Sequence, residues 1–301
     1  MKAEEFRARL EGMIAFPVTP FRPDLSLDLE GFRSNLQALL RRPPAALVAA
    51  GGTGELYSLT PDEHVKVVAA AVEEARGRVP VVAGVGFNAS LGAEMARRAA
   101  GAGASAILAL PPYYPGADEE GLLEYYAALG AATPLPLVVY SRDWVNPGPA
   151  WVERLAARVP TLAAWKDGQA DPRRLQAIMS RVGARLHWIG GAGDDAVPAY
   201  YALGIRVYTS SVANLSPRLA WSLHETAAQG DFAALRRLLE DYVLPLYAFR
   251  GRRRGYEVSA MKALMDLMGL AAGPVRPPLP DVRPEERAEL RALLDRWRPM
   301  L

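Results

Sequence analysis

The sequence predicts an α/β fold, a closed (β/α)8 TIM barrel followed by a C-terminal helical subdomain, and three observations support this. First, short apolar stretches alternate with amphipathic helical stretches in roughly eight successive units, as in repeated βαβ structure. Second, the apolar stretches lack polar alternation, which is typical of parallel strands buried on both faces. Third, helical periodicity continues without strands after Gly230. An open doubly wound sheet seldom has eight strand–helix units in such regular succession, so we expect a closed barrel over residues 1–229. The helical subdomain is expected over residues 230–301.

The first half of the predicted barrel carries recognisable helix-start signals. Ser26 is a candidate cap for the first long helix. Thr60 is expected to cap the next one, with Pro61 in its first turn and Glu63 closing a capping box. The expected strands are Met13–Thr19, Ala45–Ala50, Val81–Val85 and Ala106–Leu110, and the expected helices are Leu27–Leu40, Thr60–Arg76, Ser90–Ala102 and Asp118–Ala132.

The second half repeats the alternation, and three helices then follow it. The last two of these helices are joined by Gly273–Pro280, a proline-rich stretch that is expected to be stiff and extended. The expected strands are Pro136–Tyr140, Leu162–Lys166, Leu186–Ile189 and Ile205–Ser211, and the expected helices are Pro149–Arg158, Pro172–Val182, Asp195–Leu203, Ser216–Gln229, Phe232–Tyr247, Val258–Met268 and Glu285–Trp297.

Composition excludes several classes of function. The 301 residues carry a formal net charge of +2 with basic and acidic residues interspersed, which gives no case for binding nucleic acid or an anionic membrane. The chain contains no cysteine, which excludes disulfides, thiolate metal sites and cysteine nucleophiles. Met1–Glu11 is charged and helix-like rather than a signal peptide, and no apolar run reaches membrane-spanning length. We therefore expect a soluble, cytoplasmic protein.

The stretch Leu162–Gly168 places a lysine at the end of an apolar strand. Lysine is scarce, since Lys2, Lys66, Lys166 and Lys262 are the only ones. Only Lys166 closes a predicted buried strand, and side chains at the C-terminal ends of barrel strands point into the active site. A desolvated lysine can become a free amine that attacks a carbonyl, whereas an arginine stays charged. The alternative is a lysine that extends from the strand end into solvent.

Other strand ends carry groups suited to a carbonyl substrate. Gly51–Glu55 (Gly-Gly-Thr-Gly-Glu) follows the second predicted strand, where backbone N–H groups and the hydroxyl of Thr53 can bind a carboxylate, unless the turn merely needs glycine. Tyr140 ends the fifth predicted strand, where its phenol can transfer protons or pack at the rim. Arg142 follows it and can bind a second carboxylate or pair with an acid of the rim.

Three more groups at strand ends have both functional and structural interpretations. Tyr113 and Tyr114 form a rigid aromatic loop suited to a subunit contact or a pocket wall. Thr209–Asn214 offers hydroxyls and an amide that suit a polyhydroxylated substrate or cap the next helix. Asp194 and Asp195 are interpreted as helix-start residues rather than metal ligands, because no histidine or further carboxylate lies at ligand spacing.

The remaining candidates are interpreted structurally. His64, His187 and His224 are isolated from one another and from acidic motifs, which supports neither a zinc site nor a Ser-His-Asp triad. Arg250–Arg254 is the one basic cluster. Because no aromatic residues are interleaved with it, we interpret it as a solvated face or a subunit contact.

Together these motifs resemble the dihydrodipicolinate synthase/N-acetylneuraminate lyase family of Schiff-base lyases. The resemblance is ordered along nearly the whole chain and includes Gly51–Glu55, Tyr140, Lys166, the Gly-Asp-Asp loop and Ser210–Asn214. It implies that Lys166 forms the imine and that Tyr140 is the acid/base phenol. Thr53, with the backbone of Gly52, is then expected to hold the carboxylate of a 2-oxo acid. The resemblance also implies a homotetramer, built as a dimer of dimers.

Within that family, two departures from the synthase pattern resemble the 5-dehydro-4-deoxyglucarate dehydratases. The synthases have Tyr-Asn-x-Pro-x-Arg where this chain has Tyr140–Val145, and they have a threonine where it has Gly52. Tyr113–Tyr114 and the Gly-Asp-Asp triplet resemble the synthases instead, in which the second tyrosine reaches into the neighbouring subunit's site. Further stretches that resemble the dehydratases are Phe16–Thr19, Ala49–Glu55, Lys166–Gly168, Arg254–Tyr256, Val258–Ser259 and Gly273–Leu279.

The resemblance therefore implies a lyase that dehydrates and decarboxylates 5-dehydro-4-deoxyglucarate to 2,5-dioxopentanoate through an imine, without a metal or other cofactor. Ser210 and Asn214 are expected to contact substrate hydroxyls, Arg142 the distal carboxylate, and Tyr114 the pocket. The alternatives are a dihydrodipicolinate synthase or another pyruvate-dependent aldolase of the family, and a barrel that binds a sugar acid without turnover. In each case the expected partner is a small 2-oxo acid or keto sugar acid.

Overall fold

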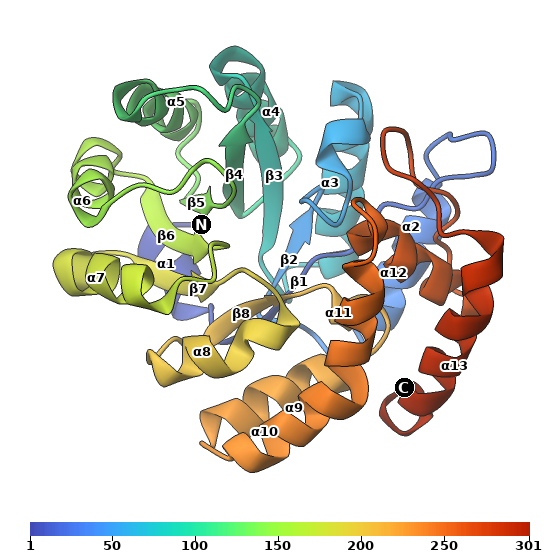
Figure 1. Cartoon of the computed structure of the whole chain (residues 1–301). Helices are drawn as coiled ribbons and strands as arrows, with labels where there is room; N and C mark the ends of the chain where they lie inside the picture. The colour runs from blue at the N-terminus through green and yellow to red at the C-terminus, as the bar shows by residue number, and fades with distance from the viewer.

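The chain folds into a closed barrel of eight parallel strands with helices outside it, which confirms the predicted fold class. The computed structural model describes all 301 residues, and the strands pair in chain order, with the last closing onto the first (Figure 1). The strands are β1 (Gly12–Ala15), β2 (Ala46–Ala49), β3 (Val81–Phe87), β4 (Ala106–Pro112), β5 (Leu137–Ser141), β6 (Leu162–Asp167), β7 (His187–Gly190) and β8 (Val207–Ser210).

Helices cover the outside of the barrel at the predicted places, with ends that differ by a few residues. Short 3-10 turns at Leu56–Ser58, Gly183–Arg185, Asp194–Ala196 and Val212–Asn214 complete the barrel. The helices are α1 (Ala3–Ala8), α2 (Leu29–Leu39), α3 (Pro61–Ala75), α4 (Ala89–Gly101), α5 (Glu119–Ala131), α6 (Pro149–Arg158), α7 (Pro172–Val182), α8 (Val197–Ala202) and α9 (Pro217–Ala228).

Two predicted helix caps have different outcomes. The capping box of α3 is confirmed, because Thr60 Oγ1 accepts the N–H of Glu63 at 3.2 Å while the Glu63 carboxylate accepts the N–H of Thr60 at 2.9 Å. Ser26 does not cap α2, because its hydroxyl donates to Asp24. Asp28 caps α2 instead and accepts a backbone N–H of the first turn at 3.1 Å. The positive end of the helix dipole also stabilises a carboxylate at this position.

β1 ends earlier than predicted, at Ala15. Phe16 still donates its N–H to Ser210, but Pro17 has no N–H and cannot extend the ladder. The next free donor, the N–H of Val18, bonds to the side chain of Asn214 at 3.0 Å. The chain thus leaves the barrel here, and the residues after β1 line its open end.

Four helices follow the barrel and pack against it. They share the main apolar core of the barrel's outer layer, to which Leu235, Phe249, Met261 and Trp297 contribute. Figure 1 shows them, in orange and red, gathered on one side of the molecule. None of the helices in the chain is long and apolar enough to span a bilayer. The four are α10 (Phe232–Leu238), α11 (Leu244–Arg250), α12 (Tyr256–Leu267) and α13 (Arg287–Trp297), with a π-helical turn at Leu239–Val243 and 3-10 turns at Pro284–Glu286 and Arg298–Met300.

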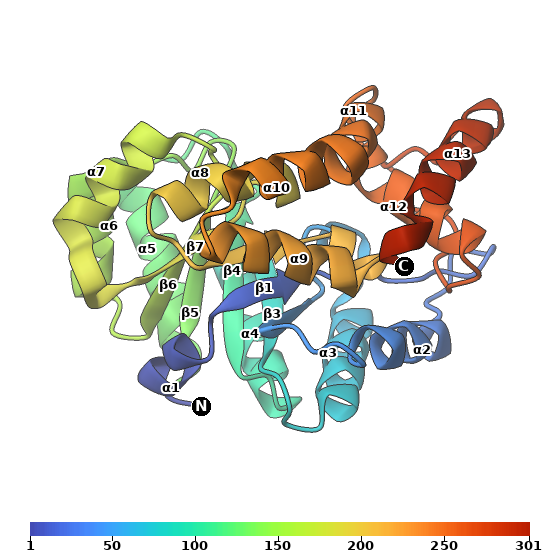
Figure 2. The ribbon, with the colours of Figure 1, turned by 90° about the horizontal axis from the view of Figure 1, so that it is seen from below.

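The interior of the barrel holds a second, smaller core. Fifteen buried residues form it, and Phe6 and Leu10 of the N-terminal segment pack there against the beginnings of the strands. Figure 2 shows α1 on the side of the barrel away from α11 and α12. The N-terminal segment therefore closes one end of the barrel, and the other end remains for the site.

Candidate active site

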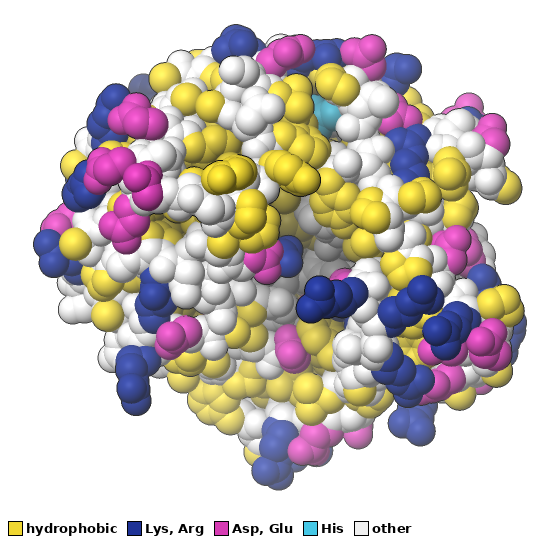
Figure 3. Space-filling model, turned by 45° about the horizontal axis from the view of Figure 1, so that its top comes forward, with side chains coloured by type: hydrophobic (Ala, Val, Ile, Leu, Met, Phe, Trp, Pro, Cys, Tyr) yellow, Lys and Arg dark blue, Asp and Glu magenta, His cyan; other side chains and the backbone are white.

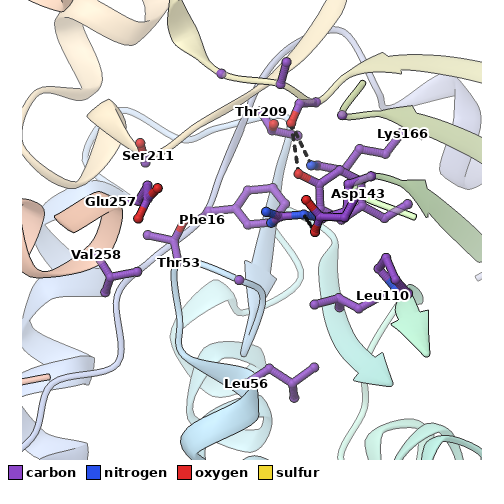
Figure 4. Close-up of a pocket in the computed structure, with 18 of the residues that line it drawn as sticks. Phe16, Thr53, Leu56, Leu110, Asp143, Lys166, Thr209, Ser211, Glu257 and Val258 are labelled. Carbon is purple, nitrogen blue, oxygen red and sulfur yellow. Dashed lines mark hydrogen bonds and ion pairs between the residues drawn. The ribbon is translucent and has the colours of Figure 1, made fainter. Parts of the chain in front are cut away.

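Lys166 lies at the C-terminal end of β6, and its side chain points into the open end of the barrel (Figure 4). It is 3% exposed, and its Nζ donates a hydrogen bond to the carbonyl of Gly191 at 2.9 Å. The same nitrogen lies 3.0 Å from the ring centroid of Tyr140, which is the partner of Lys166 in the register of β5 and β6. Burial, reinforced by the positive charge of Arg142, lowers the pKa of the Lys166 amine well below its ordinary value. This amine therefore loses its proton more readily than a lysine in water.

A second lysine, Lys262 on α12, is equally buried but has a different electrostatic environment. Its Nζ lies 2.5 Å from Oε1 of Glu55 and 2.9 Å from the carbonyl of Pro274. Burial lowers the pKa of Lys262 too, but the Glu55 carboxylate opposes that shift. Lys166 makes no ion pair with any carboxylate, and it lines the main cavity, which Lys262 does not. Of the two, only Lys166 can meet a substrate as a free amine.

Tyr140 is placed to transfer a proton next to Lys166. Its Oη donates to the carbonyl of Gly191 at 3.2 Å, so the phenol and the amine share one acceptor. A Cβ at Gly191 would lie 2.5 Å from Cγ of Lys166, and one at Gly168 would lie 2.5 Å from Cε2 of Tyr140. Both positions therefore require glycine. Burial raises the pKa of the Tyr140 phenol, so it keeps its proton and can donate it during a reaction.

These groups lie in a cavity of about 560 Å³ at the open end of the barrel. Figure 3 shows this face of the molecule, with the hollow near its centre and charged side chains around it. The loops after the strands and the helices α11 and α12 form its walls. The predicted site residues that line it are Gly52, Thr53, Tyr140, Arg142, Lys166 and Ser210.

Hydrogen bonds hold the turn Gly51–Glu55 on its side away from the cavity, which leaves the side that faces the cavity free. Thr19 donates its hydroxyl to a carbonyl of the turn at 2.7 Å. Glu55 has a left-handed φ of 53°, is buried, and accepts the N–H of Arg276 at 3.1 Å. Thr53 makes no side-chain hydrogen bond within the chain and faces the cavity (Figure 4). The hydroxyl and the backbone N–H groups of the turn are thus available to a carboxylate.

Arg142 lies between the turn and the phenol. Its Nε donates to Oδ2 of Asp143 at 2.8 Å, and its guanidinium lies 5.5 Å from the ring centroid of Tyr140. A Cβ at Gly52 would lie 3.9 Å from Nη1 of Arg142. A Cβ at position 52 would therefore make ordinary van der Waals contact with the guanidinium, and only atoms beyond it could crowd Arg142.

Comparison with known proteins identifies the family. A model of the dihydrodipicolinate synthetase family matches residues 9–297. The chain belongs to this family. The resemblance stated from the motifs is thereby confirmed.

Relatives and solved structures agree with that assignment. Probable 5-dehydro-4-deoxyglucarate dehydratases from Methylobacterium radiotolerans and Saccharopolyspora erythraea are 44% and 43% identical, over 97% and 94% of this chain and 97% and 92% of theirs. The crystal structure of dihydrodipicolinate synthase from Oceanobacillus iheyensis matches with a TM-score of 0.93 at 28% identity, over 99% of this chain and 100% of that one. A sialic acid aldolase from Ruminococcus gnavus shares the fold, with a TM-score of 0.89 at 21% identity over 97% and 100% of the two chains.

In this member of the dihydrodipicolinate synthetase family, a buried acid holds the loop after β8. Asp194 begins a 3-10 helix, as the helix-start interpretation expected, but its carboxylate is fully buried. It accepts hydrogen bonds from the hydroxyl of Ser210, from the N–H of Ser211 at 3.3 Å and from the hydroxyl of Tyr247 at 3.0 Å. Ser210 lines the cavity, yet its hydroxyl hydrogen is engaged with Asp194 and its oxygen accepts the N–H of Ala213 at 3.0 Å. Its capacity to bind a substrate hydroxyl is therefore limited.

Two predicted substrate contacts lie outside the cavity of this chain. The amide of Asn214 donates to the carbonyls of Phe16 at 2.9 Å and Ser211 at 2.8 Å, and it accepts the N–H of Val18. Backbone groups thus occupy both ends of the Asn214 amide, and its contact with substrate stays a prediction. Tyr114 is 70% exposed and lies beside the cavity, whereas Tyr113 lines its rim.

The sequence analysis missed several residues of the cavity. Gly191, whose carbonyl holds both Lys166 and Tyr140, gave no signal beyond being a glycine. Arg250 lines the cavity from the end of α11, although we interpreted the arginine cluster as a surface feature. The three histidines lie away from the cavity, and no group of three or more histidine, aspartate or glutamate side chains in the chain is arranged to hold a metal ion.

Proposed function

We propose that this chain is a lyase that converts 5-dehydro-4-deoxyglucarate to 2,5-dioxopentanoate, carbon dioxide and water through an imine on Lys166. The observation that supports it best is the buried amine of Lys166, which has no carboxylate partner and lies 3.0 Å from the ring centroid of Tyr140 inside the main cavity. The relatives at 43% and 44% identity carry the name of this dehydratase. A class I lyase needs such an unprotonated amine next to a proton donor.

The chemistry begins with attack of the Lys166 amine on the keto carbon, followed by loss of water to give a protonated imine. The imine withdraws electrons, so that a proton leaves the neighbouring methylene carbon and the hydroxyl of the next carbon departs as water. The conjugated imine then accepts the electron pair released when the distal carboxylate leaves as carbon dioxide. After protonation, water hydrolyses the imine and restores the amine, so that one water and one carbon dioxide are released in each turnover.

Each residue around the amine has a distinct part in this proposal. Tyr140 donates a proton to the leaving oxygen and takes one back, because its raised pKa keeps the phenol protonated between steps. Thr53 and the backbone of Gly52 bind the carboxylate next to the keto group, because the side of their turn that faces the cavity is free. The cavity walls keep bulk water from the imine until the last step.

Two differences from the synthase pattern, Gly52 in the turn and the sequence that follows Tyr140 at the end of β5, favour the dehydratase over a synthase. Gly52 has no hydroxyl to join a proton relay, and the guanidinium of Arg142 lies 3.9 Å from the position of a Cβ there. The paired tyrosines Tyr113 and Tyr114 are the feature that favours the synthase. Borohydride reduction with substrate, followed by mass mapping, tests the imine, and an adduct on any residue other than Lys166 contradicts the proposal.

The substrate is tested separately. We expect carbon dioxide from 5-dehydro-4-deoxyglucarate without an added aldehyde. Turnover that requires pyruvate and aspartate semialdehyde would establish the synthase instead. Tight binding of the sugar acid without adduct or product would establish a non-catalytic barrel.

The same proposal includes a homotetramer that works in the cytoplasm. Tyr113 and Tyr114 are 82% and 70% exposed, more than any other large hydrophobic side chain, and exposed aromatic pairs of this kind mark contact surfaces. Mass measurement in solution tests the assembly. A tyrosine-to-serine double substitution at these positions is expected to weaken it, and an unchanged mass would contradict that role.

A further inference from the structure

The cavity contains two arginines that differ in whether an acid already neutralises them. Arg142 donates its Nε to Asp143 at 2.8 Å. Arg250, at the end of α11, makes no ion pair with any carboxylate of the chain. A substrate carboxylate that approaches Arg142 competes with Asp143, whereas one that approaches Arg250 meets a guanidinium that forms no ion pair.

The chain holds the guanidinium of Arg250 in a fixed position. Nη1 donates to the hydroxyl of Ser211 at 3.0 Å, and the guanidinium stacks 4.6 Å from the ring centroid of Tyr247. Its Nε is buried and has no hydrogen-bond partner in the protein. A buried donor without a partner is unfavourable, and a ligand oxygen would satisfy it.

The nearby acids do not take the place of a ligand. Both carboxylate oxygens of Asp194 already accept hydrogen bonds, from Ser210 and from Tyr247 with the loop backbone. Glu257 also lines the cavity, but its carboxylate accepts the N–H of Gly255 at 3.0 Å. Neither is within ion-pair distance of Arg250. Burial raises the pKa of Asp194 and of Asp195, and the charge of Arg250 opposes that shift through space, but no carboxylate of the chain forms an ion pair with the guanidinium.

The position of Arg250 separates it from the imine-forming groups. Lys166 and Tyr140 lie at the ends of β6 and β5, whereas Arg250 is bonded to Ser211 in the loop after β8. Figure 4 shows Ser211 and Lys166 on different sides of the pocket. Both residues line the same cavity, so a substrate bound at Lys166 through its keto group has its far end free to extend toward Arg250.

We propose that Arg250, together with the hydroxyl of Ser211, binds the distal carboxylate of a dicarboxylic 2-oxo acid and selects diacids over monoacids. This inference rests on the proposed function, because that carboxylate is the one that leaves as carbon dioxide. The planar guanidinium fork matches a carboxylate in two parallel hydrogen bonds. The C-terminal helices then supply substrate specificity, while the barrel supplies the amine and the phenol.

The proposal also predicts how the kinetic constants divide. Arg250 stabilises the carboxylate while it is charged, and that stabilisation is lost as neutral carbon dioxide forms. Removing the guanidinium therefore weakens substrate binding more than it slows the chemical step. For Arg250→Gln we expect KM for the diacid to rise about 10- to 100-fold, with kcat changed less than about fivefold.

Two probe acids of equal length isolate this effect. 2-Oxoadipate and 2-oxohexanoate differ only in the distal carboxylate, and the concentration of each that gives half-maximal borohydride trapping reports its affinity. We expect wild type to favour the diacid about 10-fold or more, and Arg250→Gln to lose that preference. Arg250→Lys is expected to restore part of it, because it keeps the charge without the fork. Arg254→Gln, in the same cluster but outside the cavity, is the matched control and should change neither value.

The outcomes distinguish this inference from the proposed function. Trapping of pyruvate, which has no distal carboxylate, should change less than about twofold in Arg250→Gln, and this also shows that the variant is folded. If Arg250→Gln keeps the diacid preference, or weakens both probes equally, the inference is overturned while the imine stands. If wild type traps no 2-oxo acid at all, the proposed function fails, and the role assigned to Arg250 fails with it.

Discussion

Replacing Lys262 with methionine tests whether a buried ion pair holds the carboxylate-binding turn in place. The side chains of Glu55 and Lys262 are 0% and 2% exposed, and their charged atoms lie 2.5 Å apart. The pair joins the end of the turn to α12, and the N–H of Arg276 adds a hydrogen bond to the same carboxylate. Methionine is close to lysine in length but leaves Glu55 buried without its cation.

The magnitude follows from that burial. Removing one partner of a buried pair costs about 3–5 kcal/mol, because it leaves an uncompensated charge. With an unfolding entropy of about 2.1 cal/mol/K per residue, the melting temperature of a chain of this length falls by about 5–8 °C. The double variant Glu55→Gln/Lys262→Met removes both charges and keeps an acceptor for Arg276, so we expect a fall of only about 2–3 °C. The double variant is thus more stable than the single one.

Scanning calorimetry at one fixed heating rate measures these shifts, and Lys66→Met provides an exposed control that should leave the melting temperature within about 1 °C. Trapping of pyruvate by borohydride reports the turn itself, because Thr53 lies in it. We expect the single variant to need about 10-fold more pyruvate for half-maximal trapping. If Lys262→Met melts no lower than the double variant, the pair does not act as a coupled unit and the reasoning is refuted.

Four further predictions concern the amine, the phenol, the pH dependence of stability and the turn. Lys166→Arg should form no borohydride adduct, and its kcat should fall by about 10³-fold or more because arginine keeps its proton, so retained turnover would disprove the imine. Tyr140→Phe should lower kcat by about 10²- to 10⁴-fold with little change in KM, measured by carbon dioxide release, and a change confined to KM would contradict its proton-transfer role. Burial also lowers the pKa of Lys166 from its usual value of 10.5, so between these two pKa values the unfolded chain holds a proton that the folded chain has lost. The free energy of unfolding contributed by this site therefore rises with pH over that range. Lys166→Met should flatten this rise, measured by urea unfolding at a series of pH values. Gly52→Thr should reduce kcat/KM for the diacid about 10-fold by crowding Arg142, and a fully active variant would show that the guanidinium tolerates a side chain there.

Much of the barrel and the centre of the site followed from local sequence pattern. Lys166 and Tyr140 each end an apolar run, and the strand order of a parallel barrel brings such ends together. Thr60 and Glu63 form a cap through contacts three residues apart, which sequence spacing encodes directly. Features of this kind depend on neighbours in the chain and on a fold-wide rule, so the sequence sufficed.

The parts that were missed depend on contacts between distant segments. Asn214 serves the backbone of Phe16, which lies 198 positions away, and no local pattern could distinguish this from a ligand contact. Arg250 lines the cavity because α11 packs at the open end of the barrel. Lys262 finds Glu55 only after α12 has docked on the barrel. In each case the partner is supplied by tertiary packing.

The acid next to Lys166 in sequence shows how the strand geometry protects the reactive amine. The charge of Asp167 opposes the lowering of the Lys166 pKa, but its carboxylate does not pair with Nζ as that of Glu55 pairs with Lys262. Successive side chains of a strand point to opposite faces, so Lys166 enters the barrel interior while Asp167 turns toward the helices. There Tyr200 donates its hydroxyl to the carboxylate of Asp167 at 2.9 Å and fixes it outside the cavity. A strand can therefore carry a lysine and an aspartate in succession without an ion pair between them, because the alternation points the two side chains to opposite faces.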